Sequence, residues 1–165
     1  MAVGPTYSSI STQTLTSTQA TVTFSGIPST YTDLILIIGG TNASNDQGIV
    51  TRVGNGSIDT GSNYSSSYVF GDGSSSQSGR STNETYIIAG RMNTSSSVSI
   101  IHYMNYSNTS TNKVILGRGN DTTYVLHHVG LWRSTVAINT LNVFNLSSVS
   151  FAAGTVLTLY GIAAA

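Results

Sequence analysis

Apolar and polar positions alternate with a period of two over many short segments of this chain. Residues 20–25, for example, place Ala20, Val22 and Phe24 on one side, which is the pattern of a half-buried β-strand. Turn residues separate these segments, and no stretch of useful length follows a helical period. The pattern predicts an all-β fold, an antiparallel β-sandwich or jelly roll of about ten strands. The expected strands occupy residues 7–15, 20–25, 34–38, 48–53, 64–70, 85–89, 98–106, 113–116, 123–132, 136–146 and 156–162.

Residues 34–38 form the longest uninterrupted run of large aliphatic side chains, and Gly39 and Gly40 close it. A run of this length is short for a helix and predicts a strand that is buried on both faces. A strand of a two-sheet sandwich normally buries only one face. We therefore expect a loop, a neighbouring subunit or another protein to cover the second face of this strand.

Two stretches are dominated by turn-forming residues. Residues 54–81 are rich in Gly, Ser, Asn and Asp, with one apolar island at residues 64–70. Leaving that island in water is unfavourable, so we expect an ordered long loop with a single strand inside it. Residues 117–121, Gly-Arg-Gly-Asn-Asp, predict a turn after a short strand.

The composition favours a part of an assembly. With 165 residues, the chain is expected to form one domain over residues 1–165. Charged residues make up 7% of it, the formal net charge is +0, and Ser and Thr together account for roughly three residues in ten. A weakly charged, neutral surface has little self-repulsion, so such a protein associates easily.

The same numbers argue against several partners. The six basic residues are scattered, whereas nucleic-acid binding needs a clustered basic face. No apolar run approaches the length of a membrane span, and no Cys is present. Residues 1–5 lack the features of a signal peptide, so synthesis in a cytoplasm is expected. We expect neither nucleic acid nor membrane as a partner.

The residues that carry most enzyme chemistry form no recognisable constellation. His127 and His128 are adjacent, so on a strand they point to opposite faces and cannot easily share a metal ion. The Asp residues sit in turn-like clusters, where an Asx side chain typically bonds its own backbone. Asn45-Asp46 and Asn120-Asp121 have too few carboxylates for an EF-type calcium loop. The expectation is a protein without enzymatic activity, metal or cofactor.

Four residues are candidates for an interaction surface. Trp132 and Arg133, with Tyr64 and Tyr68, have the residue types of an aromatic surface that binds a sugar or a protein. In the alternative interpretation, Trp132 belongs to the core and Arg133 caps a strand end. For the two tyrosines, core and interface are equally compatible with the sequence, because large aromatic side chains dominate both.

Several passages resemble one family over nearly the whole chain. They are FSGIP at 24–28 before YTDL at 31–34, DTGSNY at 59–64 with YVFGDGS at 68–74, GLWRST at 130–135, and FAAGT at 151–155 with LYGI at 159–162. This set is similar to small structural proteins of tailed bacteriophages, notably marine and cyanobacterial ones, and to the terminal modules of some phage fibres. The motifs mark turns, a core aromatic residue and a last core strand.

The resemblance implies a virion protein. One role is a capsid decoration, or cement, protein that binds the major capsid protein or other virion proteins as a homo-oligomer, with a trimer favoured. The alternative role is a tail-fibre or spike module that binds a host-surface receptor or glycan. Because no coiled coil or shaft precedes the β domain in this sequence, decoration is the expected role, with synthesis in the host cytoplasm and a final location in the virion.

Overall fold

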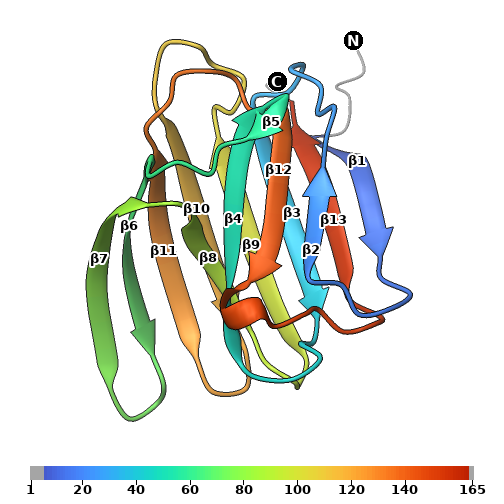
Figure 1. Ribbon diagram of the computed structural model, residues 1–165, viewed down its shortest axis with the longest axis vertical. Coiled ribbons are helices and arrows are strands. Elements are labelled where there is room, and N and C mark those ends of the chain that lie inside the picture. The colour runs from blue at the N-terminus through green and yellow to red at the C-terminus, as the bar shows by residue number, and fades with distance from the viewer. Residues whose placement is uncertain (1–5, 164–165) are drawn as a thin grey trace.

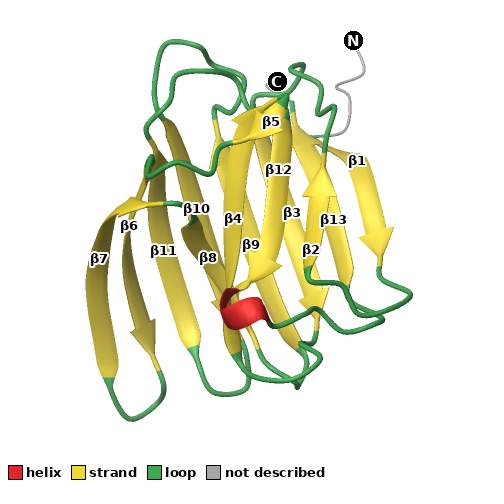
Figure 2. Cartoon of the chain, in the orientation of Figure 1, coloured by secondary structure: helices red, strands yellow, loops and turns green. Residues whose placement is uncertain are grey.

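The computed structural model describes residues 6–163; residues 1–5, where the sequence shows no signal-peptide features, and residues 164–165 lie outside the described part. The described chain is almost entirely β-structure, as predicted, with thirteen strands and one short 3-10 helix (Figure 2). The elements are β1 (Tyr7–Thr14), β2 (Thr21–Phe24), β3 (Asp33–Gly40), β4 (Gln47–Asn55), β5 (Ser57–Ile58), β6 (Tyr64–Gly71), β7 (Ser76–Glu84), β8 (Ile87–Met92), β9 (Ser97–Met104), β10 (Lys113–Asn120), β11 (Val125–Trp132), β12 (Thr140–Asn145), η1 (Leu146–Ser148) and β13 (Val156–Ile162).

The strands form two antiparallel sheets that pack as a β-sandwich (Figure 1). The larger sheet has eight strands in the order β1-β13-β3-β9-β10-β11-β6-β7. The smaller sheet has five strands in the order β2-β12-β4-β5, with β8 paired to β4. Strands β1 and β7 are therefore the two edges of the larger sheet.

The core lies between the sheets, where the inward side chains, every second residue of each strand, meet. Leu36 on β3 and Leu159 on β13 come from the larger sheet, and Val53 on β4 and Leu141 on β12 from the smaller one; all four have 0% exposure. Phe151 and Tyr106, which lie in connecting segments, are fully buried as well. The core therefore closes at its ends with aromatic residues from loops.

Strand β3 tests the prediction of burial on both faces. Its inward residues Leu34, Leu36 and Ile38 are completely buried. On the other face Ile35 is 7% exposed, whereas Ile37 is 36% exposed. Within residues 6–163 nothing lies over Ile37, so the chain by itself covers the second face only in part. Cover by a neighbouring subunit or another protein stays a prediction.

Strand β7 was not predicted, and neither was the two-residue β5. Residues 76–84 were expected to belong partly to a long loop, because none of them is large and apolar. They form a nine-residue strand that pairs with β6 from Ser76 opposite Gly71 to Glu84 opposite Tyr64. As an edge strand, β7 needs no apolar pattern, because most of its side chains stay in water.

The predicted turn at residues 117–121 is also wrong, since β10 continues to Asn120. Gly117 and Gly119 face the interior, where the second sheet comes very close. A Cβ on Gly117 would overlap the backbone of Ala89 in β8, and one on Gly119 would lie 2.5 Å from the Ser99 Oγ. These glycines serve close packing rather than a turn.

Candidate interaction surface

Tyr64 and Trp132, two of the four residues singled out in the sequence, belong to the core. They are 0% and 2% exposed, and their rings stack with centroids 6.5 Å apart. The Trp132 Nε1–H donates to Asp59 Oδ2 at 2.7 Å, and the Tyr64 hydroxyl donates to the Asp59 carbonyl oxygen at 2.9 Å. Burial raises the pKa of Tyr64 to about 12. Neither ring contributes to an exposed aromatic surface in this chain.

The Asp59 carboxylate accepts hydrogen bonds from Gly61, Asn63 and Trp132, and so connects its loop to β11. Burial acts to raise the pKa of its carboxyl group, but donors from Trp132, Asn63 and the backbone of Gly61 outweigh burial and lower it. Arg133 ties the adjoining loop to β6 and β7: it donates to the Ser65 Oγ and to the Asn83 Oδ1 at 3.0 Å. Arg133 is thus engaged by the protein's own groups.

Tyr68 lies apart from the other three residues, farther along β6. Its ring is half-buried and stacks on His128 of β11, with centroids 5.2 Å apart. The structure therefore brings Tyr64, Trp132 and Arg133 together and places Tyr68 in a different environment.

A larger feature is the outer face, which we define as the side of the eight-stranded sheet that points away from the five-stranded sheet. Residues 6–163 leave nine large apolar side chains exposed, and strand alternation and register place eight of them on this face. They are Tyr7, Ile37, Val69, Val98, Met104, Val125, Val129 and Val156. Exposed apolar residues scattered singly are ordinary, but eight of nine on one sheet face make that face a candidate interaction surface.

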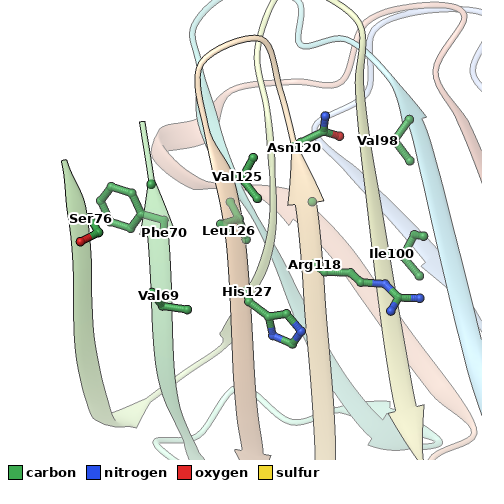
Figure 3. Close-up of a pocket in the computed structure, with 12 residues that line it drawn as sticks. Val69, Phe70, Ser76, Val98, Ile100, Arg118, Asn120, Val125, Leu126 and His127 are labelled. Carbon is green, nitrogen blue, oxygen red and sulfur yellow. The ribbon is translucent and has the colours of Figure 1, made fainter. Parts of the chain in front are cut away.

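The outer face is hollowed near one end (Figure 3). The hollow has a volume of about 680 Å³ and is lined by Val69 on β6, Val98 and Ile100 on β9, and residues of β10 and β11 between them. Arg118 and His127 also border it. A concave apolar surface with a few polar groups at its border suits a protruding side chain or strand of a partner.

Charge is sparse on the outer face. Arg118 and Arg80 project from β10 and β7, and the Asp33 carboxylate bonds the His102 Nε2 at 3.0 Å and the Asn105 backbone N–H at 2.6 Å. Interface cores are depleted in charged residues in the same way. The sequence indicated this face in one way. Residues 98–106 and 123–132 have apolar side chains at both odd and even positions, so both faces of these strands carry apolar residues.

Asp72 and Asp121 occupy turns, as predicted from their sequence context, whereas Asp33 and Glu84 lie at the ends of strands β3 and β7. Asp72 accepts hydrogen bonds from the backbone N–H groups of Ser74 and Ser75, which lower its pKa. Asp121 accepts in the same way from Thr123 and Tyr124. These are Asx turns.

Asp46 and Asp121, from the two sequences with a faint likeness to calcium loops, do approach each other, but Arg91 lies between them. The Arg91 Nη2 is 2.5 Å from Asp46 and its Nε is 3.4 Å from Asp121. A guanidinium group thus takes the place that a cation would need. Within residues 6–163, no three His, Cys, Asp or Glu side chains are grouped so as to hold a metal ion.

Comparisons with known proteins identify no family. No protein-family model matches the chain, and no curated protein matches its sequence. A crystal structure of a protein of unknown function from Shewanella oneidensis MR-1 aligns with 96% of this chain and 77% of its own, at 10% identity and a TM-score of 0.25. In the described chain, no helix has the length and apolar character needed to cross a membrane.

Proposed function

We propose that this protein is a structural component of a bacteriophage virion, where it decorates and cements the capsid shell as a homo-oligomer. The single observation that carries an assembly role is the apolar outer face of the eight-stranded sheet. The phage context comes from the resemblance of the sequence passages described above, such as GLWRST at 130–135. The partners in this proposal are the major capsid protein or other virion proteins and further copies of the chain, with three copies favoured.

The size of the outer face supports this proposal. Eight strands spaced about 4.8 Å apart and about 26 Å long give a footprint of roughly 900 Å². Each partner of a stable protein–protein interface contributes roughly 800 Å². Burial of apolar surface contributes roughly 25 cal/mol per Å², although association costs offset much of that gain. A face of this size is therefore sufficient for stable attachment.

A tail-fibre or spike module that binds a host-surface receptor is the alternative role. The half-buried Tyr68 ring favours it, since this ring lies where the second sheet ends and is free of the core cluster. The two roles differ in copy number, because decoration proteins coat the shell whereas tail modules are few.

Quantitative mass spectrometry of purified particles distinguishes these roles. We expect the number of copies per particle, divided by that of the major capsid protein, to be one or a simple fraction. A handful of copies per particle would move the protein to the tail, and complete absence from particles would refute both virion roles.

A matched pair of variants tests whether the outer face is the attachment surface. Val129→Lys places a charge on this face, where the wild-type side chain is 48% exposed. Val136→Lys makes the same change at a residue that is 47% exposed but lies outside the strands. We expect V129K to bind particles at least about tenfold more weakly than wild type, because a buried unpaired charge is costly, and V136K to bind normally. Equal occupancy of the two variants on particles would show that the outer face is not the attachment surface.

A further inference from the structure

A cleft of about 290 Å³ opens between the two sheets, on the opposite side of the larger sheet from the outer face. It exists because the eight-stranded sheet extends past the five-stranded one. Strand β8 packs against β9, β10 and β11, but the hairpin β6–β7 projects beyond it (Figure 1). Tyr64, at the start of β6, is still buried in the core, but Tyr68 and Phe70 farther along the strand are only partly covered by the second sheet. We call this space the inter-sheet cleft.

Aromatic rings dominate the inter-sheet cleft. Tyr68 stacks on Phe70 with ring centroids 6.1 Å apart, and Phe70 meets the Tyr124 ring edge-on at 5.8 Å. All three rings are half-buried, so each keeps part of its surface accessible. His128, which is 5% exposed, lies against Tyr68, and its Nδ1 has no hydrogen-bond partner.

Glycines shape the walls of the inter-sheet cleft. A Cβ on Gly79 of β7 would lie 2.5 Å from the Tyr68 hydroxyl oxygen, so the missing side chain lets the Tyr68 ring lie across the edge strand. Gly48 on β4 and Gly90 on β8 line the opposite wall. A Cβ on Gly90 would lie 2.5 Å from the Ser99 Oγ, and one on Gly48 would lie 3.2 Å from the Leu146 Cδ1, so packing within the protein accounts for both glycines.

The polar groups of the inter-sheet cleft suit an uncharged ligand. Arg91 lies over the Tyr124 ring at 3.9 Å, but the carboxylates of Asp46 and Asp121 more than offset its charge. The Gln47 and Ser81 side chains add neutral hydrogen-bonding groups. An anion would therefore find no net positive charge beside the cleft, and a purely apolar ligand would leave the polar groups unpaired.

We propose that the inter-sheet cleft binds an uncharged carbohydrate, with the apolar face of a pyranose ring against Tyr68 and its hydroxyl groups toward Gln47, Ser81 and Arg91. A pyranose presents C–H groups on one face and hydroxyl groups around its edge, which matches flat aromatic rings bordered by neutral polar groups. The inference does not depend on attachment through the outer face, because the two surfaces lie on opposite sides of the larger sheet.

Saturation-transfer NMR with the methyl pyranosides of glucose, galactose, mannose and N-acetylglucosamine tests this assignment on the full chain. We expect saturable transfer to the ring protons of at least one glycoside, weakened about tenfold or more in Tyr68→Ala. Tyr7→Ala is the matched control, because Tyr7 is 53% exposed on the outer face. It should bind as wild type does.

Gly79→Ala provides a second variant that keeps every aromatic ring, with circular dichroism as the check on folding. The added methyl group displaces Tyr68, so binding should weaken in a folded protein. If Y68A does not fold, G79A decides the question. No transfer to any of the four glycosides, or transfer that persists in the folded cleft variants, would overturn the proposal. Neither outcome bears on particle occupancy, so failure here leaves the decoration proposal intact.

Discussion

Adjacent residues on one strand meet opposite environments in this protein, and His127 and His128 show it most clearly. His127 is exposed on the outer face, whereas His128 is buried beside Tyr68. Burial, with a contribution from the neighbouring His127, lowers the pKa of His128 to about 4 from its ordinary value of 6.5. At neutral pH the His128 ring is therefore uncharged in the folded protein.

This shift predicts a pH dependence of stability. The unfolded chain protonates His128 as the pH falls through 6.5, but the folded protein does so only near pH 4. Its stabilising contribution is therefore complete above 6.5 and is lost progressively as the pH falls to about 4, by about 3 kcal/mol at most.

Urea unfolding at a series of pH values measures this loss. His128→Gln should lose less stability than wild type between pH 6.5 and about 4. His127→Gln should keep most of the wild-type loss, because burial is the larger cause of the lowered pKa of His128 and His127 the smaller one. If the free energy of unfolding of H128Q falls with pH as steeply as that of wild type, groups other than His128 cause the loss of stability.

At the scale of elements, the close approach of β8 to β10 depends on small residues. Gly117 has no space for a methyl group, because the Ala89 backbone lies directly opposite. Gly39 on β3 offers a contrast, since a Cβ there would meet nothing within 4 Å and its backbone is not in the left-handed region. Two strand glycines of the same larger sheet thus have different structural roles.

Gly117→Ala should lower the free energy of unfolding by about 1–3 kcal/mol, because the two sheets must move apart. Gly39→Ala should change it by no more than about 0.5 kcal/mol, since the residue fits without strain. Thermal or urea unfolding of both variants measures the difference. Equal free energies of unfolding for the two variants would mean that β8 moves away from the added methyl group without loss of stability, and that packing does not require glycine at position 117.

At the scale of the whole molecule, the outer face combines apolar character with almost no charge, and the chain has a net charge of +0. Association through such a face is driven by burial of apolar surface rather than by ion pairs. The proposed attachment to the particle through this face should therefore persist as salt is raised from about 0.05 M to about 1 M, because only exposed ion pairs are strongly screened.

Occupancy of purified particles at the two salt concentrations measures this, with V129K as the variant that should lower occupancy at both. Loss of the protein from particles at high salt alone would instead assign the contact to charged groups such as Arg118 and Asp33.

The sequence by itself determined the class of fold, because period-two patterning is local and reports which residues of a strand face the interior. It also indicated strands with apolar residues on both faces, such as residues 34–38. It did not reveal β7, whose strand conformation comes from pairing with β6 rather than from its own pattern. Gly117 and Gly119 were misassigned to a turn, because their real constraints are the backbone of β8 and the Ser99 side chain of β9, which no local pattern reveals.

The tertiary structure decided which candidate residues share a site. Tyr64, Tyr68 and Trp132 are all large aromatic residues, and the sequence does not separate their environments. The register of β6 on β11 stacks Tyr64 on Trp132 inside the core and leaves Tyr68 beside His128 in the inter-sheet cleft. That difference arises from how far the five-stranded sheet covers the eight-stranded one. Coverage depends on strand order and sheet width, which are properties of non-local pairing, and no local pattern of residues encodes them.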